Sequence, residues 1–496
     1  MIMSSDVLTL PPVQNRFASL PSDFYRRVQP QGLTQARLVH VNAALAARCG
    51  LDPDVLSSQA FLDMAAGNAG LPDGITLAAV YSGHQFGVWA GQLGDGRALL
   101  LGETVGPAGP LEWQVKGAGL TPFSRMGDGR AVLRSSIREY LASAAMQGLG
   151  IPTTEALSLA ASNDPVRRET LETAAIVLRI APSFIRFGSF EHWASLKRVD
   201  HLATLCDFVI THYYPELKAL PTQEARATAL FTEVVRRSAE LVAAWQSVGF
   251  CHGVLNTDNM SILGLTLDYG PFAFMDGFNV HHICNHSDQA GRYAWDAQPS
   301  VFHWNLVRLA NALLPLTQDQ APLVDALQRF EPQFRTGIEQ RMAAKLGLQT
   351  WREADHELVN ALWSLMHAQR ADFTLTFRLL GNVPDQADPA ADQAWLQLFS
   401  DPTPARDWLQ RYRQRLAEQT LPEAERAQRM HAVNPLYILR NHLAEGAIQQ
   451  AKQRNDNEVR RLMDVLQDPY TERAGYEAYA EPAPDWASTL SISCSS

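Results

Sequence analysis

Residues 252–270 read HGVLNTDNMSILGLTLDYG, and this stretch decides how the rest of the chain is interpreted. Short apolar runs around glycines interrupt the surrounding helical periodicity, and we expect a small hairpin with a polar loop over about residues 261–275. Before it, the periodicity predicts a long helix over about residues 225–248, ended by Gly249. The chain beyond about residue 185 is therefore predicted to be mainly helical, with one short β insertion.

The same stretch resembles the catalytic region of protein kinases. In the pattern H-R-D-x-x-x-x-N the asparagine lies seven residues after the histidine, and Asn259 keeps that spacing. Asp268 opens the triplet Asp-Tyr-Gly and matches the metal-binding aspartate of D-F-G, and such hard oxygen ligands suit Mg²⁺ beside phosphates. Val254 stands where a kinase has its catalytic aspartate, which disfavours ordinary phosphoryl transfer. Asp258, directly before the asparagine, offers a base in a different place.

A glycine-dense segment, residues 81–103, has the character of a phosphate-binding loop. An apolar run at residues 98–101 and alternation over residues 111–115 place this loop between strands. Its backbone N–H groups can approach phosphate oxygens, and Lys116 on the next strand, expected to be partly exposed, can neutralise their charge. Glu139 follows 23 residues later on a predicted helix, and we expect it within ion-pair reach of the lysine. The alternative interpretation is tight hairpins and solvated surface charges.

With these features in place, the chain resembles the selenoprotein O family of protein adenylyltransferases, called pseudokinases because the kinase aspartate is missing. The resemblance covers nearly the whole chain. It rests on residues 252–270, called the catalytic stretch below. It also rests on the blocks YSGHQFGVWAGQLGDGRA, QVKGAGLTPFSRMGDGRAVLRSSIREYLASAA, RFGSFE and NPLYILRNHLAE. Cys494, in the final Ser-Cys-Ser-Ser, stands where some relatives carry selenocysteine.

The resemblance implies transfer of AMP from ATP, or UMP from UTP, to hydroxyl side chains of proteins, with the nucleotide reversed relative to kinases and pyrophosphate released. It assigns Asp258 as the proton acceptor and Asn259 and Asp268 as ligands of Mg²⁺ or Mn²⁺. The nucleotide contacts that it implies are Gly94, Gly96, Arg97, Lys116, Asp128, Gly129, Arg179, Arg186 and Asp268.

The expected architecture is an α+β, two-lobed, protein-kinase-like fold with an enlarged helical C-terminal lobe. Residues 1–185 are predicted to form the nucleotide-binding lobe. Residues 186–496 are predicted to form the helical lobe, which carries the catalytic and metal-binding loops and ends in a flexible tail with a cysteine.

Composition limits the partners. With 42 basic and 52 acidic side chains the net charge is −10, so nucleic acid is not expected as a partner. The five cysteines form no C-x-x-C pair and no long apolar run occurs, so we expect a cytoplasmic protein without a membrane span. The expected partners are target proteins, redox-related ones among them, and the chain itself through auto-modification, and we expect a monomer.

Two other functions remain open at this stage: a metal-dependent kinase that transfers the γ-phosphate through Asp258, and a non-catalytic nucleotide-binding scaffold. The retained Lys116, Asn259 and Asp268 disfavour the scaffold. A further hypothesis is a regulatory disulfide between Cys284, in the loop after the metal-binding aspartate, and Cys494 in the tail. Two independent free thiols are the alternative.

Overall fold

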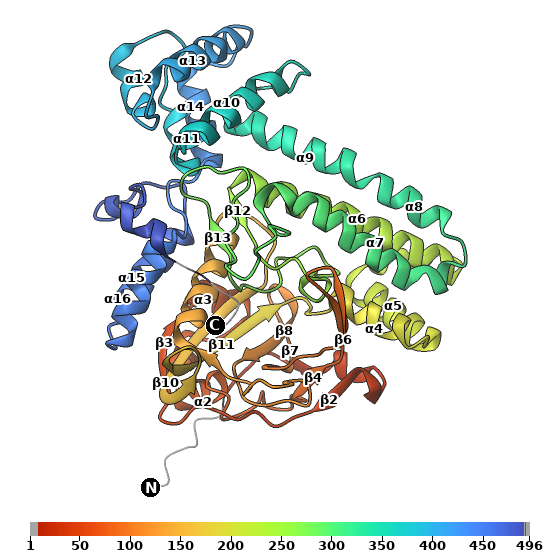
Figure 1. Cartoon of the computed structure of the whole chain (residues 1–496). Coiled ribbons are helices and arrows are strands. Elements are labelled where there is room, and N and C mark those ends of the chain that lie inside the picture. The colour runs from red at the N-terminus through yellow and green to blue at the C-terminus, as the bar shows by residue number, and fades with distance from the viewer. Residues whose placement is uncertain (1–7, 491, 493–496) are drawn as a thin grey trace.

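The structure is a computed structural model that describes residues 8–490 and 492. An antiparallel sheet forms the N-terminal part, with the strand order β2-β4-β7-β8-β11-β10-β3, β1 beside β7 and β9 beside β11 (Figure 1). Its strands are β1 (Val13–Gln14), β2 (Tyr25–Arg27), β3 (Arg37–Val41), β4 (Leu77–Ala79), β7 (Ala98–Gly106), β8 (Gly109–Lys116), β9 (Ala131–Val132), β10 (Glu155–Arg167) and β11 (Leu171–Ala181).

Both faces of the central strands are covered, and the period of two along each strand decides which side chain meets which core. In β7, Leu99 and Leu101 belong to the core beneath α1 (Ala43–Arg48) and α2 (Gln59–Ala65). Leu100 belongs to the core on the opposite face, which carries α3 (Leu133–Gly148). The α3 face is the one that also carries the polar side chains described below.

The C-terminal region is largely helical (Figure 1). Its helices are α4 (Phe187–Ser195), α5 (Val199–Tyr213), α6 (Gln223–Ser247), α7 (Gln298–Thr317), α8 (Ala321–Gln328), α9 (Phe330–Lys345), α10 (Asp355–Gln369), α11 (Phe373–Leu380), α12 (Pro389–Leu396), α13 (Pro402–Leu416), α14 (Glu423–Val433), α15 (Asn441–Lys452) and α16 (Asn457–Leu466). The chain is thus of the mixed α+β class, and α6 confirms the helix predicted over residues 225–248.

The hairpin expected within residues 261–275 is wrong in its pairing. A single bridge joins Met260 and Thr266, while the regular pair is β12 (Phe250–Cys251) with β13 (Ala273–Phe274). The strands that flank the catalytic stretch therefore pair with each other and bring its two ends together. Asn259 and Asp268 lie on the irregular segment between them.

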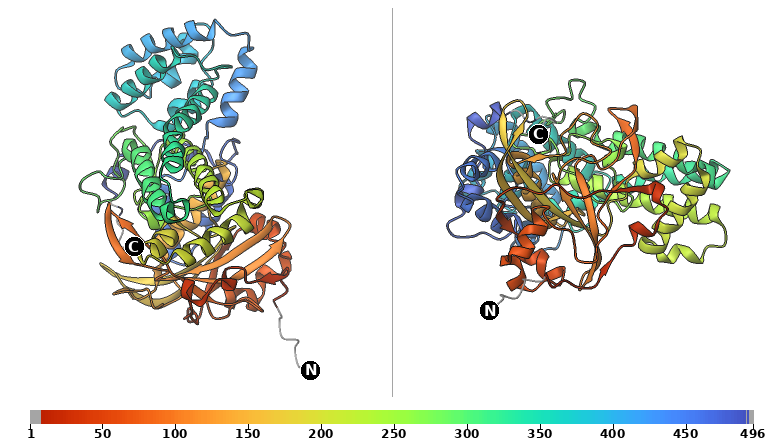
Figure 2. Two further views of the ribbon diagram at one scale, coloured as in Figure 1. Left: turned by 90° about the vertical axis from the view of Figure 1, so that its right-hand side faces the viewer. Right: turned by 90° about the horizontal axis from the view of Figure 1, so that it is seen from below.

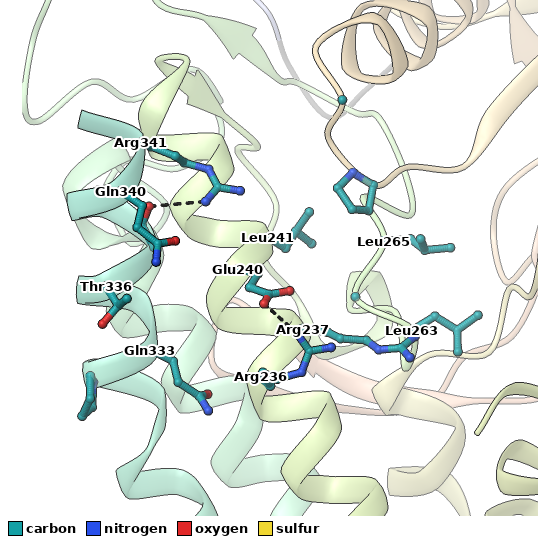
Figure 3. A pocket seen from close by; sticks show the side chains of 15 residues that line it. Arg236, Arg237, Glu240, Leu241, Leu263, Leu265, Gln333, Thr336, Gln340 and Arg341 are labelled. Carbon is teal, nitrogen blue, oxygen red and sulfur yellow. Dashed lines mark hydrogen bonds and ion pairs between the residues drawn. The ribbon is translucent and has the colours of Figure 1, made fainter. Parts of the chain in front are cut away.

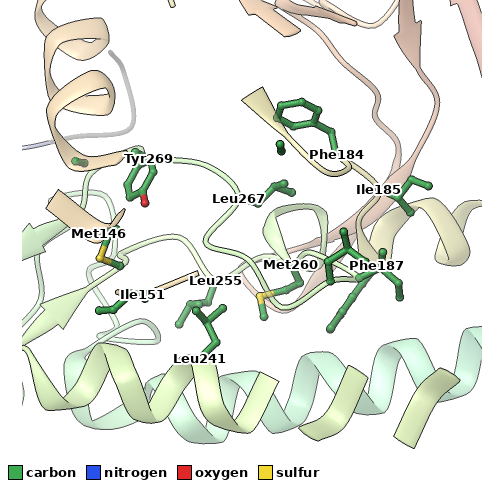
Figure 4. Packing of buried hydrophobic residues seen from close by; sticks show 14 of the residues in the cluster. Met146, Ile151, Phe184, Ile185, Phe187, Leu241, Leu255, Met260, Leu267 and Tyr269 are labelled. Atoms are coloured by element: carbon green, nitrogen blue, oxygen red, sulfur yellow. The ribbon is translucent and has the colours of Figure 1, made fainter. Parts of the chain in front are cut away.

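One apolar core runs from the sheet into the helical region. Met146 of α3, Leu241 of α6 and Leu267 beside the Asp-Tyr-Gly triplet all belong to it (Figure 4). A further core serves the C-terminal end of α9 and helices α10 to α14; α9 packs along α6, and α10 to α14 stand at the far end of the molecule from the sheet (Figures 1 and 2). The catalytic stretch is therefore packed between the sheet and α6, and its backbone position depends on both.

The last helices return to the N-terminal part. Both α15 and α16 pack against α3, and Arg37 of β3 forms an ion pair with Asp456 (Figure 1). The segment after residue 468 is attached to α16 through Tyr479, which is buried and donates a hydrogen bond to Glu458 (2.8 Å). The end of the chain thus braces the helix that carries Glu139.

Candidate active site

A cleft of about 860 Å³ opens between the α3 face of the sheet and the catalytic stretch. Its lining comes from the glycine-dense loop before β7, the loop between β8 and β9, and residues 258–268. The residues predicted from the sequence that line it are Gly94, Gly96, Arg97, Lys116, Asp128, Gly129, Arg179, Arg186, Asp258, Asn259 and Asp268. Segments far apart in the sequence therefore contribute to one cavity of nucleotide size.

Four charged side chains meet at the inner wall of this cleft: Lys116, Glu139 and Arg179 are buried, and Asp268 is partly exposed. Lys116 Nζ lies 2.7 Å from Glu139 Oε2 and also donates to Asp268 Oδ1. Arg179 Nη1 lies 3.0 Å from both Glu139 Oε1 and Asp268 Oδ1. Burial alone would raise the pKa of the Asp268 carboxyl, but Lys116 and Arg179 hold that pKa well below its usual range. Asp268 is therefore an anion at every physiological pH.

The pleat of the sheet places these groups together. Arg179 on β11 lies opposite Gln114 on β8 and donates to its side-chain oxygen, and Lys116 follows two residues later on the same face. Lys116 was expected to be partly exposed, and this is wrong: its side chain is buried, as is that of Glu139. The cause is α3, which covers this face of the sheet and carries the glutamate.

Asp258 has an environment suited to a general base. It lies on the single turn Thr257–Asn259, where Gln85 Nε2 donates to its Oδ2 (3.1 Å). Its Oδ1 has no hydrogen-bond partner among the described residues. Burial raises the pKa of this carboxyl to about 6, so it is ionised at neutral pH and still able to take a proton. Arg186 Nη1 donates to the Asp258 carbonyl (2.8 Å) and fixes the backbone there.

Asn259 and Asp268 present oxygen atoms to the same cleft. Asn259 Nδ2 donates to the Val254 carbonyl (3.1 Å), which leaves the amide oxygen for another partner. Within the described chain, the hydrogen bonds and ion pairs of Asp268 all go to Oδ1, so Oδ2 is left as an acceptor. One carboxylate oxygen and one amide oxygen facing the same cleft are ligands of the kind that Mg²⁺ and Mn²⁺ prefer. No group of three or more His, Cys, Asp or Glu side chains suited to a metal ion occurs in residues 8–490.

Two glycine loops close the outer side of the cleft. A Cβ at Gly94, where φ is +136°, would lie 2.4 Å from the ring of Phe123, and one at Gly96 would lie 2.9 Å from the Phe123 carbonyl oxygen. A Cβ at Gly129, where φ is +70°, would lie 2.1 Å from the backbone of Gly119. Glycine is required at positions 96 and 129 because the loops touch backbone to backbone there, and at position 94 because of its positive φ and the adjacent Phe123 ring.

Sequence reasoning missed three polar residues of this site. Gln85 bonds the Asp258 carboxylate, and Asp95, whose pKa burial raises, accepts from the Ala79 N–H (3.1 Å). Both lie in the glycine-dense segment, and the polar residues of that segment could have indicated them as site residues. Arg168, at the β10–β11 turn, pairs with Asp128 (2.7 Å) and had no signal, because the turn brings together residues 40 positions apart.

The structure describes one of the two cysteines in the predicted disulfide, Cys284. Cys284 is a buried free thiol whose pKa burial raises, and its Sγ donates to the Cys251 carbonyl (3.4 Å). Cys494 lies outside the described residues. The backbone two residues before it does reach this loop, since the His286 N–H donates to the Ile492 carbonyl (2.9 Å). The disulfide stays a prediction.

A second cleft, of about 840 Å³, lies between α6, α9 and the loop around residue 264 (Figure 3). Its arginines already have partners: Arg236 pairs with Glu240 (2.6 Å), Arg237 pairs with Glu233 (2.9 Å), and Arg341 donates to a backbone carbonyl (3.3 Å). None of the residues predicted from the sequence lines it. Its lining includes a single carboxylate, Glu240, whereas Asp95, Asp128, Asp258 and Asp268 all line the first cleft.

Comparison with known families agrees with this geometry. Residues 8–467 match the model of the family described as Protein adenylyltransferase SelO. The chain belongs to this SelO family. It is a protein nucleotidyltransferase, an enzyme of AMPylation, which confirms the resemblance noted in the sequence.

Full-length relatives carry the same description. The chain is 57% identical to Protein nucleotidyltransferase YdiU of Bordetella avium, over 100% of both chains. It is 52% identical to the protein of that name from Paraburkholderia xenovorans, over 99% of this chain and 97% of the relative. Against the Ralstonia nicotianae protein the identity is 52%, over 97% and 95%. Residues 8–490 contain no helix with both the length and the apolar character needed to span a bilayer.

Proposed function

We propose that this SelO enzyme is a two-lobed, kinase-like protein that holds ATP and a divalent cation in the first cleft and transfers AMP to hydroxyl side chains. The proposed lobes are residues 1–185, which contain the sheet and the glycine loops, and residues 186–496. The last sheet strand ends at Ala181 and the helical region begins at Phe187, which supports this division. The accepting hydroxyls belong to Ser, Thr or Tyr of target proteins and of the enzyme itself.

The buried cations favour a reversed nucleotide. Lys116 of β8 and Arg179 of β11 are both nearly inaccessible, and they lie on the sheet side of the cleft. A triphosphate whose β- and γ-phosphates point toward them is compensated in a site of low dielectric constant, where each charge pair is worth more than in water. The α-phosphate then lies toward the catalytic stretch and Asp258.

In the proposed step, the acceptor hydroxyl oxygen attacks the α-phosphorus while Asp258 takes the hydroxyl proton. A bond forms between that oxygen and the α-phosphorus, and the bond to the bridging oxygen of the β-phosphate breaks. Pyrophosphate leaves with the electron pair, and Lys116 and Arg179 stabilise its charge. The free Oδ1 of the Asp258 carboxylate supports its assignment as the acceptor of the proton.

The residues that would hold the cation are Asn259, through its amide oxygen, and Asp268, through Oδ2. When bound, Mg²⁺ or Mn²⁺ neutralises phosphate charge as the leaving group develops. Asp268 also accepts from Lys116 and Arg179, so the same carboxylate orders the cations that face the phosphates.

The observation that carries the proposal is the Asp258 carboxylate at the cleft, whose Oδ1 has no hydrogen-bond partner among the described residues, in a chain with the aliphatic Val254 where a kinase has its base. The test compares ATP labelled at the α- or the γ-phosphate, with casein added as an unfolded hydroxyl-rich acceptor. Incorporation of the α-label alone is expected, and Asp258→Asn, which keeps the shape, should lower it by about 10²- to 10⁴-fold. Incorporation of the γ-label would establish the kinase alternative, and labelled UTP in a parallel reaction measures UMP transfer.

A further inference from the structure

A small β-hairpin stands apart from the main sheet at the mouth of the active-site cleft. Its strands are β5 (Ser82–Gln85) and β6 (Val88–Gln92), and they form a separate two-stranded sheet (Figure 1). One side of β5 is covered by α4 and by the turn that carries Asp258. Among the described residues β6 pairs only with β5, so its outer edge has unpaired backbone N–H and C=O groups. Such an edge is a template for another extended chain.

The same hairpin exposes large apolar side chains. Phe86 is 41% exposed, Val88 70% and Trp89 40%, within four consecutive residues. Exposed apolar side chains that gather in this way mark interaction sites more often than singly scattered ones do. The Trp89 ring packs edge-on against the His84 ring, with ring centroids 5.0 Å apart, and this contact restricts the orientation of the Trp89 side chain.

The turn of the hairpin is strained and is held in place by the catalytic stretch. Phe86 and Gly87 have φ of +51° and +81°, as a two-residue turn of type I′ requires, and a bulky residue rarely adopts this conformation. The Phe86 N–H donates to Asn256 Oδ1 (3.1 Å) and Tyr293 Oη (2.9 Å). Strain of this kind persists where surrounding contacts impose it, and it is concentrated at functional positions.

Two further hydrogen bonds fix the hairpin relative to the proposed base. The His84 N–H donates to Thr257 Oγ1 (2.7 Å), and Gln85 donates to the Asp258 carboxylate (3.1 Å). A chain paired with β6 would therefore lie at a constant offset from Asp258. Positioning of this type is what brings one hydroxyl of a large target to the reacting phosphate.

Positive charge lies beside the turn. Arg292 stacks over the Trp304 ring at 4.8 Å and Arg308 at 4.9 Å, and neither forms an ion pair with a carboxylate in the described part of the chain. A Cβ at Gly87 would lie 2.9 Å from the Arg292 guanidinium carbon, so this cation is next to the hairpin turn. An acidic side chain on the bound chain would complement it.

We propose that the outer edge of β6 binds the target protein, as an extended segment that adds a third strand to the β5–β6 sheet. Apolar side chains of that segment pack on Val88 and Trp89, and an acidic residue meets Arg292 at the turn. The hydroxyl that receives AMP lies beyond this strand, next to Asp258. The inference rests on the proposed function, because it assigns the protein-binding surface of that same site.

The test uses a fluorescent peptide of about ten residues with alternating Val and Thr, one Tyr and one terminal Asp, a length that pairs with all of β6. Its twin is N-methylated at alternate residues, which removes the N–H groups that a ladder needs. Binding is measured by anisotropy with the full-length enzyme and ATP. The wild type should bind the peptide about tenfold more tightly than the twin. Equal binding of the two, or no binding of either, would overturn the proposal.

Variants separate docking from chemistry. Val88→Asp should weaken peptide binding by about tenfold and leave ATP binding within about twofold, because the side chain is exposed and outside the nucleotide cleft. The matched control is Val324→Asp, on α8 and 42% exposed, which should bind as the wild type does. Equal peptide affinity of Val88→Asp and wild type would refute the docking surface.

Charge reversal tests the orientation. Arg292→Glu should weaken binding of the Asp peptide, and replacing that Asp by Lys should restore it. Asp258→Asn should bind the peptide normally and transfer the α-label about 10²- to 10⁴-fold more slowly. A peptide that binds in this way but receives the γ-label would disprove the proposed chemistry and leave the docking surface standing, so the two failures can be told apart.

Discussion

Lys116→Met tests the buried charge cluster. The substitution keeps most of the side-chain volume and removes one of two cations that compensate Glu139 and Asp268. Arg179 alone, at 3.0 Å from each carboxylate, would then face two negative charges, the buried Glu139 and the partly exposed Asp268. Breaking a buried pair costs about 3–5 kcal/mol, since the partner's charge is left uncompensated. We expect the free energy of unfolding to fall by about 3 kcal/mol, near the lower end of that range, because Arg179 remains beside both carboxylates.

The cluster also predicts a rescue. In the double variant Lys116→Met with Glu139→Gln, one carboxylate and Arg179 are left in balance, so about half of the lost stability should return while transfer stays abolished. Amide hydrogen exchange of β8 and α3 measures the opening free energy of this part of the fold directly. The control is Lys452→Met, whose side chain is exposed near the end of α15. A cost below about 1 kcal/mol for Lys116→Met, or a double variant less stable than the single one, would refute the reasoning.

The remaining predictions concern chemistry and redox state. Since burial raises the pKa of Asp258 to about 6 and the base must be ionised, transfer should fall about tenfold per pH unit below 6. Gln85→Leu removes a hydrogen bond to the ionised Asp258 carboxylate and should raise the pKa of Asp258 by about one unit. The activity that this variant loses at pH 7 should then return at about pH 8.5. A pH–rate profile identical to that of the wild type would contradict the prediction. Asp268→Ala should retain less than about a tenth of the wild-type rate, which is a loss of more than about 1.4 kcal/mol of transition-state stabilisation. A higher rate would show that other residues hold the cation. Chelation of divalent ions should abolish transfer, with recovery on adding Mg²⁺ or Mn²⁺, and unchanged activity in chelator would exclude the metal role. Non-reducing peptide mapping of oxidised protein should show a linked Cys284–Cys494 peptide, and its absence would support two independent thiols.

The amino-acid sequence by itself determined those features that depend on short spacings. The interval from the histidine to Asn259 and the triplet at Asp268 indicated a kinase-like catalytic region, and with the other motifs they indicated the family to which the chain belongs. Periodicity located α6, because a helix repeats its buried face about every 3.6 residues regardless of what it packs against. Such patterns are local, so they can be read without knowing the partner.

Tertiary structure alone decided which of these groups meet and which are buried. Lys116 reaches a carboxylate 152 positions away, and Gln85 reaches Asp258 across 173 positions. No spacing along the chain encodes such pairs, because they depend on how the sheet, α3 and the catalytic stretch pack together. The predictions of a partly exposed Lys116 and of a hairpin within residues 261–275 were wrong for the same reason. The environment of these residues is set by distant segments, whose packing free energy outweighs local propensity.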